Sequence, residues 1–261
     1  MTEPEPLPPG GKVYFIGAGP GDPDLITVKG RGLIERCAVC LFAGSLVPRA
    51  VVAFAPAGAT VRNTASLDLD AIVGLMAEAT AAGRDVARVH SGDPSLYGAI
   101  AEQMRRLDAL GINYEVVPGV SAFQAAAAAL KIELTPAGKN QSVILARASG
   151  RTGVSPCDDL AELARHGTGM ALFLSAAQMP ELVAALAPSY GLEAPVVAVY
   201  RVSWPDEQIF RGTLADIGAQ MAAAGITRTA LILIGPMLDD AAPSESHLYD
   251  KTYSHLFRKA P

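Results

Sequence analysis

The sequence is poor in the features that mark secreted and membrane proteins. It has three cysteines among 261 residues, too few for a disulfide framework, which favours a reducing compartment. Half of its residues are hydrophobic, yet no apolar run reaches the roughly 18–20 residues that a membrane span needs. The acidic, proline-rich start lacks the basic and apolar stretches of a signal peptide. We therefore expect a disordered leader over residues 1–11 and a cytoplasmic protein without membrane contact.

The sequence also lacks a basic excess and a pattern of metal ligands. It has 21 lysines and arginines against 26 acidic residues, whereas nucleic-acid-binding proteins usually carry more basic residues. Cys37 and Cys40 form a CxxC, but no second CxxC or nearby pair of histidines completes four zinc ligands. We interpret both cysteines as small buried hydrophobic residues. We expect neither a metal site nor a nucleic-acid partner.

Signatures of nucleophilic catalysis are missing as well. There is no Gly-x-Ser-x-Gly elbow, and the four histidines are scattered along the chain. Among them, His90 stands at the end of an expected strand near glycine-rich segments, where a histidine can be structural or a general base.

What the sequence does contain is a regular alternation of apolar runs and helical patterns. Strands are expected at 12–16, 38–42, 85–90, 114–117, 142–147, 169–174, 195–201 and 229–234, and helices at 24–36, 67–82, 96–110, 121–130, 158–166, 179–187 and 214–224. Several of these strands are continuously apolar, as expected when both faces of a sheet are covered. The alternation predicts an α/β fold.

The alternation also suggests two domains of similar size. The segment 134–141, with its proline, glycine and polar residues, is the best candidate for a linker. We therefore expect an N-terminal α/β domain over 12–133, a C-terminal α/β domain over 142–243, and a C-terminal tail over 244–261.

The segment 17–24, directly after the first expected strand, is rich in glycine and proline. Glycines in such a segment let a ligand approach the main chain closely. The segment is not a dinucleotide fingerprint, because Asp22 replaces the third glycine and Pro20 has no N–H to offer a pyrophosphate. No Gly-Lys-Ser/Thr follows, so it is not a P-loop. A Rossmann fold is disfavoured further because the strand region 38–47 has no carboxylate for ribose hydroxyls.

Two further strand-to-helix turns, 91–97 and 118–122, have the same character. Each turn alone is an ordinary helix start, with Asp93 or Ser95 as the cap of one and Ser121 as the cap of the other. Ligands in open α/β sheets bind beyond the carboxyl ends of the strands. The three segments together therefore predict one ligand pocket.

These segments resemble the tetrapyrrole methylases, a family that uses S-adenosylmethionine on a non-Rossmann α/β fold. The similar stretches are 17–25 (GAGPGDPDL), 91–97 (SGDPSLY), 117–122 (VPGVSA), 171–175 (ALFLS) and 229–235 (TALILIG). Four more, 42–47, 146–152, 199–206 and 248–258, are similar to the branch that methylates C11 of precorrin-4, or of its cobalt form, in cobalamin biosynthesis.

The resemblance implies two α/β domains with S-adenosylmethionine in the cleft between them, usually in a homodimer. Carried onto this sequence, the cofactor contacts would be Pro20, Gly92, Asp93, Ser95, Ser121, Ala122, Leu174, Ala198, Tyr200 and Ala230. Leu174 stands where relatives often have methionine, and Ser121 where many have threonine; both departures are minor.

The implied reaction moves a methyl group from a sulfonium to a ring carbon. The leaving group is already good, so positioning can supply much of the acceleration, and the missing catalytic triad agrees with this. A base or solvent must finally remove a proton from the methylated macrocycle. Asp93, His90 and Tyr97 are the candidate bases, and the sequence does not choose among them.

The implied substrate is a precorrin-type tetrapyrrole with many carboxylates, whereas the chain is acidic. Basic residues must therefore gather locally, and arginine suits carboxylates. The candidates are Lys139, Arg147, Arg151 and Arg201, each of which could instead be a solvated surface charge. Two alternatives stay open: methylation of another tetrapyrrole or ring position by the same fold, and a tetrapyrrole-binding protein without catalysis.

Overall fold

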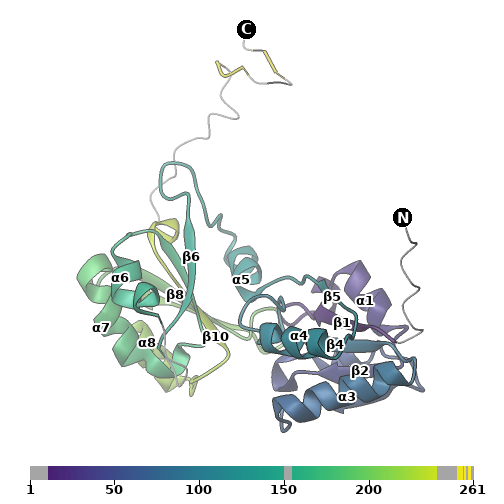
Figure 1. Ribbon diagram of the computed structural model, residues 1–261. Helices are drawn as coiled ribbons and strands as arrows, with labels where there is room; N and C mark the ends of the chain where they lie inside the picture. The colour runs from purple at the N-terminus through teal and green to yellow at the C-terminus, as the bar shows by residue number, and fades with distance from the viewer. Residues whose placement is uncertain (1–10, 150–154, 240–251, 255, 257, 260–261) are drawn as a thin grey trace. The chain divides into compact units, whose positions relative to one another are not determined.

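The computed structural model describes residues 11–149, 155–239, 252–254, 256 and 258–259. The chain divides into two compact units (Figure 1). Unit 1 comprises the residues up to Ala125 together with Ser203–Pro205, and unit 2 comprises Ala126–Val202 and the residues from Asp206 onward. Each unit contains a sheet with helices, which confirms the α/β fold class. Arg151 and most of the expected tail lie outside the described residues.

Unit 1 is built on a five-stranded parallel sheet in the order β3-β2-β4-β1-β5. The strands are β1 (Val13–Gly17), β2 (Val39–Phe42), β3 (Thr60–Asn63), β4 (Val86–His90) and β5 (Tyr114–Val117). Because β4, β1 and β5 are neighbours and run in the same direction, the loops that follow them leave from adjacent carboxyl ends.

Both faces of this sheet are covered. Tyr14 and Ile16 of β1 belong to a buried cluster with residues of α1 (Val28–Ile34) and α2 (Arg49–Val52). Val13 and Phe15 belong to a second cluster with residues of α3 (Leu69–Ala81) and α4 (Ile100–Ala109). Alternate residues of a strand point to opposite faces, so the continuously apolar β1 supplies both clusters.

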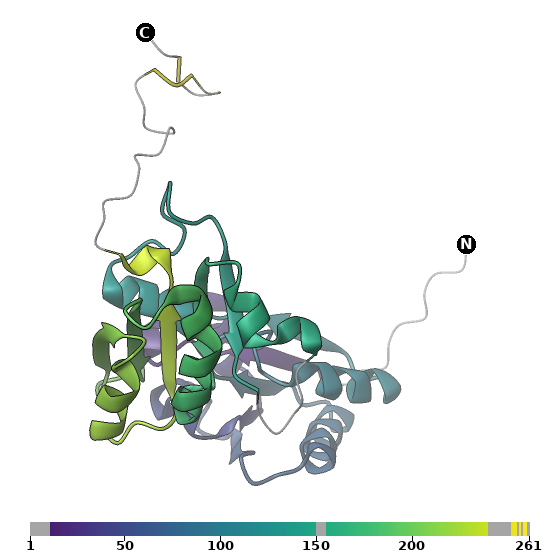
Figure 2. The same ribbon diagram turned by 90° about the vertical axis from the view of Figure 1, so that its left-hand side faces the viewer.

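Unit 2 has a mixed five-stranded sheet in the order β6-β7-β10-β8-β9. The strands are β6 (Val143–Arg147), β7 (Gly169–Phe173), β8 (Pro195–Tyr200), β9 (Gln208–Thr213) and β10 (Ala230–Ile234). β6 and β7 are parallel, and the other neighbouring pairs are antiparallel. The helices α6 (Leu160–Ala164), α7 (Met179–Tyr190) and α8 (Ile217–Ala223) pack on one face and lie in front of the sheet in Figure 2.

Each strand expected from the sequence is present, whereas β3, β9 and the short α2 were not expected. α5 (Ala122–Leu130) begins in unit 1 and ends in unit 2, and residues 134–141 fall in unit 2 between α5 and β6. In the described part of the chain, no helix has the length and apolar character needed to cross a bilayer.

Candidate functional site

The loops after β1 and β4 are joined by backbone hydrogen bonds. The amide of Ala18 donates to the carbonyl of His90 at 2.7 Å, and Gly19 and Gly92 form an antiparallel bridge. In that bridge the Gly92 amide donates to the Gly19 carbonyl at 2.8 Å. The segments 17–24 and 91–97 therefore lie side by side.

Three glycines allow the loop after β5 to join this pair. A Cβ on Gly119 would lie 2.2 Å from the carbonyl oxygen of Gly92, and a Cβ on Gly17 would lie 2.6 Å from the Cα of Gly119. Gly92 has a φ of 61°, a left-handed conformation that favours glycine. The three loops thus meet through their main chains, at distances that no side chain would permit.

The carboxylate of Asp93 ties the β4 loop to the β5 loop. Its Oδ2 accepts a hydrogen bond from the Gly119 amide at 2.9 Å, and its Oδ1 accepts from the amide and the hydroxyl of Ser95. Partial burial acts to raise the carboxyl pKa, but the bonds from Ser95 and Gly119 outweigh it and hold the pKa of Asp93 below its usual value. Asp93 is therefore an ionised link between two loops.

Ser121 begins the helix that follows the third loop. Its carbonyl accepts from the amides of Gln124 and Ala125, while the Gln124 side chain accepts from the Ser121 amide at 3.0 Å. This is the backward half of a capping box, and it places Ala122 at the first position of α5. Ser121 is 3% exposed.

Below these loops lies a buried polar network. Arg88 on β4 donates from Nε to the Gln103 side chain at 3.0 Å and from Nη1 to the Thr64 hydroxyl at 3.0 Å. The Gln103 amide in turn donates to the carbonyl of Ala99 at 3.0 Å. Burial lowers the pKa of Arg88 to about 10, so the guanidinium stays charged at neutral pH.

His90 is 3% exposed, on the same face of β4 as Arg88. Burial, with a smaller contribution from the charge of Arg88, lowers the pKa of His90 to about 3. Its imidazole is therefore neutral at physiological pH. Within the described residues, its Nε2 atom has no hydrogen-bond partner.

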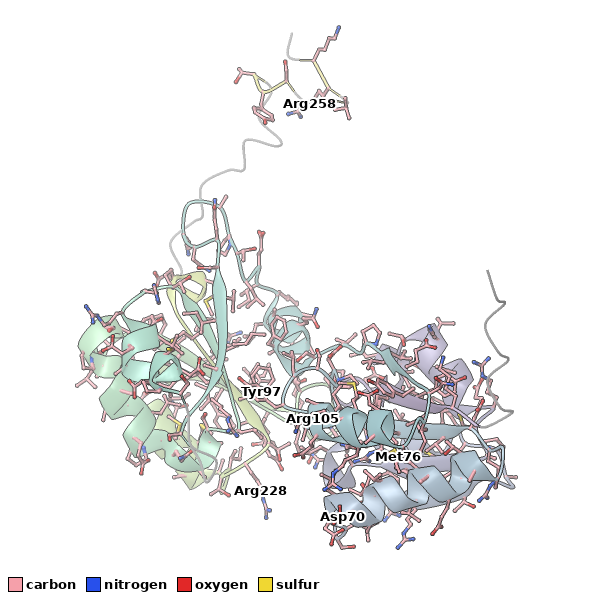
Figure 3. The ribbon with its side chains drawn as sticks, in the orientation of Figure 1. Asp70, Met76, Tyr97, Arg105, Arg228 and Arg258 are labelled. Carbon is pink, nitrogen blue, oxygen red and sulfur yellow. The ribbon has the colours of Figure 1, made fainter. Side chains whose placement is uncertain are left out.

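Tyr97 lies between the β4 loop and α4 (Figure 3). Its φ is 57° and that of Ala99 is 50°, both in the left-handed region that non-glycine residues rarely adopt. The bond from Gln103 to the Ala99 carbonyl helps to hold this segment. Tyr97 is 42% exposed.

In unit 2, several of the predicted site residues lie at one edge of the sheet. Tyr200 ends β8 and is the register partner of Ala230, which begins β10. Leu174 follows β7 and is 62% exposed, and its φ of 54° is in the left-handed region that non-glycine residues rarely adopt. Ala198 is fully buried in the core two residues before Tyr200.

The basic candidates do not all share that edge. Arg147 ends β6 and pairs in register with Phe173 at the end of β7, and Arg201 directly follows β8. The Arg201 guanidinium pairs with Asp206 at 2.8 Å. Lys139 instead precedes β6 and donates to the carbonyl of Asp239 after β10, so the length of a strand separates it from Arg147. Arg151 lies outside the described residues.

Two of the three cysteines are packed in the core of unit 1, whereas Cys157 is exposed in unit 2. Cys37 and Cys40 are fully buried, and burial raises the pKa of their thiols to about 12 and about 11. Their thiols are therefore unreactive. Among the residues that the structure describes, no three His, Cys, Asp or Glu side chains are grouped as a metal site would require.

Comparison with known proteins identifies the class. The model of the Tetrapyrrole (Corrin/Porphyrin) Methylases matches residues 12–218. The chain belongs to this family and is a methyltransferase. A relative from Pseudomonas aeruginosa, named precorrin-4 C(11)-methyltransferase, is 53% identical over 246 residues, which cover 94% of this chain and 98% of the relative.

Solved structures agree with this family. The structure of a cobalt-precorrin-4 methyltransferase of cobalamin biosynthesis is 46% identical and has a TM-score of 0.85, covering 87% of this chain and 96% of its own. A uroporphyrin-III C-methyltransferase from Thermus thermophilus, solved with S-adenosylhomocysteine, is 26% identical with a TM-score of 0.74. That similarity covers 90% of this chain and 98% of the Thermus chain.

Proposed function

We propose that this chain transfers a methyl group from S-adenosylmethionine to C11 of precorrin-4 or cobalt-precorrin-4. The observation that carries this proposal is the 53% identity to a relative of that activity across 94% of the chain. The family match spans all three loops that meet in unit 1. The high similarity to a cobalt-precorrin-4 methyltransferase structure supports the same acceptor.

The loop cluster of unit 1 fits S-adenosylmethionine, which when bound supplies a methyl group on a sulfonium. The cluster offers small side chains, an exposed Ser95 and the ionised Asp93 at the carboxyl edge of a parallel sheet, where such folds bind ligands. We assign cofactor contacts in unit 1 to Pro20, Gly92, Asp93, Ser95, Ser121 and Ala122, and in unit 2 to Leu174, Tyr200 and Ala230. Ala198 is not assigned, because it is fully buried in the core of unit 2. The Thermus relative solved with S-adenosylhomocysteine supports this cofactor.

The candidate bases differ in their environments. Asp93 accepts three hydrogen bonds and its pKa is lowered, which suits holding two loops beside a positive charge better than taking a proton. His90 is buried with a pKa of about 3, so it is a weak base. Tyr97 is the exposed member of the set. Exposure alone does not make Tyr97 a base, because a neutral phenol is a poor proton acceptor. We therefore propose that solvent takes the final proton.

The substrate carries several carboxylates, so it needs local positive charge. Arg147 and Arg201 lie at the strand ends of unit 2 that also carry Leu174 and Tyr200. We propose that these two arginines, with Arg151, bind the substrate carboxylates, and that Lys139 makes at most a distant contribution. We further propose that the protein acts in the cytoplasm as a homodimer.

Two measurements test the proposed function. Calorimetry should show binding of S-adenosylhomocysteine by the purified protein, which a tetrapyrrole carrier has no need to bind. Each of precorrin-4, cobalt-precorrin-4 and uroporphyrinogen III should be incubated with S-adenosylmethionine. A mass increase of one methyl group is expected with precorrin-4 or cobalt-precorrin-4, and none with uroporphyrinogen III. NMR of the product should place that group at C11. Methylation of uroporphyrinogen III alone would replace this function with the alternative acceptor.

A further inference from the structure

Ser203 and Trp204, which belong to unit 1 although they lie between β8 and β9 in the sequence, contact the β1 loop. The indole N–H of Trp204 donates to the carbonyl of Pro20 at 2.9 Å. Next to it, the amide of Asp22 donates to the hydroxyl of Ser203 at 2.9 Å. Ser203–Pro205 groups with unit 1 although it is more than 180 residues away from the β1 loop.

These two bonds hold the middle of the β1 loop, Pro20–Asp22. The Gly19–Gly92 bridge fixes the start of the loop, and a hydrogen bond from the Asp24 amide to the Asp22 carboxylate fixes its end. Between them, the Pro20 carbonyl and the Asp22 amide are met by Trp204 and Ser203. The peptide planes on both sides of Gly21 are thereby set by the β8–β9 connection.

The connection is itself held in a demanding conformation. Arg201 and Ser203 have φ values of 46° and 63°, in the left-handed region. Non-glycine residues keep such values when their surroundings enforce them. The ion pair between Arg201 and Asp206, at 2.8 Å, closes this turn, and the Arg201 amide donates to the carbonyl of Thr229 at 3.0 Å. These bonds and φ values restrict the conformation of the segment 201–206.

We propose that Trp204 and Ser203 are positioning residues that set the conformation of Pro20–Asp22 for cofactor binding. This inference rests on the proposed function, because it takes the β1 loop as part of the S-adenosylmethionine site. Trp204 and Ser203 act through the main chain of the loop. Loss of either bond lets the loop sample other conformations, so ligand must reorder it on binding.

The first test measures S-adenosylhomocysteine affinity by calorimetry. Trp204→Phe keeps an aromatic ring but removes the donor, and Ser203→Ala removes the acceptor. Each neutral bond is expected to change the dissociation constant about two- to tenfold. Gln208→Ala, an exposed position on the neighbouring β9, serves as the matched control and should bind as the wild type does.

The second test uses the fact that Trp204 is the single tryptophan of the chain. Its fluorescence reports directly on the Pro20 carbonyl, so addition of S-adenosylhomocysteine to the wild type should shift or quench the emission. In the Ser203→Ala variant, the same fluorescence titration should give the higher dissociation constant that calorimetry measures for this variant. The KM for S-adenosylmethionine should rise in both variants, while thermal unfolding changes little.

The outcomes separate this inference from the proposed function. A wild-type protein that binds no S-adenosylhomocysteine contradicts the proposed function. Wild-type binding with unaltered affinity in both Trp204→Phe and Ser203→Ala overturns the positioning role alone. A lower unfolding temperature with unchanged affinity of the folded fraction would make the two residues structural and also overturn it.

Discussion

At the scale of single residues, the site depends on a few side chains that hold backbone in place, and Asp93 is the clearest case. Its two carboxylate oxygens accept from Gly119 and from Ser95. We predict that Asp93→Ala lowers the rate of methyl transfer far more than it lowers stability. The free energy of unfolding should fall by about 1 kcal/mol, which is typical of a lost cap. Turnover and urea unfolding of the same preparations measure both quantities.

Asp93→Asn sharpens this test. An amide accepts on one oxygen only, so it can satisfy Ser95 or Gly119 but presents a donor to the other. We therefore expect the asparagine variant to behave nearly as the alanine variant does. Full activity in either variant would mean that Asp93 contributes nothing beyond the local turn.

His90 should make stability depend on pH. Its folded pKa is about 3, against 6.5 for an unperturbed histidine. Below pH 6.5 the histidine is protonated in the unfolded state but stays neutral in the folded state. The free energy of unfolding is therefore highest above pH 6.5 and falls as the pH is lowered toward 3. From pH 7 to pH 5 the loss should be about 2 kcal/mol. Urea unfolding of wild type and His90→Leu measures it.

Comparison with His90→Leu separates the effect of His90 on stability from that of the carboxylates that titrate in the same pH range. The wild type should lose more stability than His90→Leu over this interval, because the leucine has no proton to take up. Parallel pH profiles for the two proteins would mean that the imidazole is accessible and titrates normally in the folded state.

At the scale of elements, the close approach of three loops requires glycine. A Cβ on Gly119 would meet the Gly92 carbonyl and the Cα of Gly17 at 2.2 and 2.8 Å. We predict that Gly119→Ala costs about 1–3 kcal/mol of stability and weakens S-adenosylhomocysteine binding, because backbone cannot yield as a side chain can. Chemical unfolding and calorimetry test the two effects.

A helical glycine provides the control. A Cβ on Gly74 of α3 would meet no described atom within 4 Å, so Gly74→Ala should raise stability by about 0.5–1 kcal/mol. Binding should not change. Equal behaviour of the two alanine variants would show that the loops can separate without cost.

The elements that could be predicted from sequence are those with a hydrophobic signal. β1 and β10 are buried along their whole length, and their continuous apolar sequence predicts a strand. β3 is exposed at every residue and lies at the sheet edge, so its pairing with β2 leaves no apolar pattern. The expected helix over 96–110 begins later, at Ile100, because Tyr97 and Ala99 adopt left-handed conformations that composition does not reveal.

The same division holds for the site. The three loops could be predicted because glycine-rich turns at strand ends follow from local sequence and parallel topology. The contact of Trp204 with Pro20 and that of Gln103 with Arg88 could not, because each joins residues distant in the chain. The one available signal was that a single tryptophan lies within a strand connection.

At the scale of the whole molecule, charge sets the problem of substrate binding. The chain carries 26 acidic and 21 basic side chains, so its mean field repels a polycarboxylate. Attraction must then come from basic groups in one place. Our proposal assigns this role to Arg147 and Arg201 at the strand ends of unit 2. Other basic residues form surface pairs, such as Arg106 with Asp70.

We predict that Arg147→Gln and Arg201→Gln each raise the KM for the tetrapyrrole and leave S-adenosylhomocysteine binding nearly unchanged. Arg151→Gln, outside the described residues, belongs to the same series. Two variants serve as controls. Arg106→Gln removes an equal charge from a surface pair, and Asp206→Asn removes the partner of Arg201 but keeps its charge.

Ionic strength supplies the last discrimination. Attraction between partly exposed charges is screened over roughly 8–10 Å at ordinary salt, so the difference in KM between wild type and the arginine variants should shrink as salt increases. A purely structural effect of either arginine would persist at high salt. Steady-state kinetics at low and high ionic strength, at fixed pH, measure this difference. If all three arginine variants keep the wild-type KM at low salt, other residues bind the carboxylates of the macrocycle.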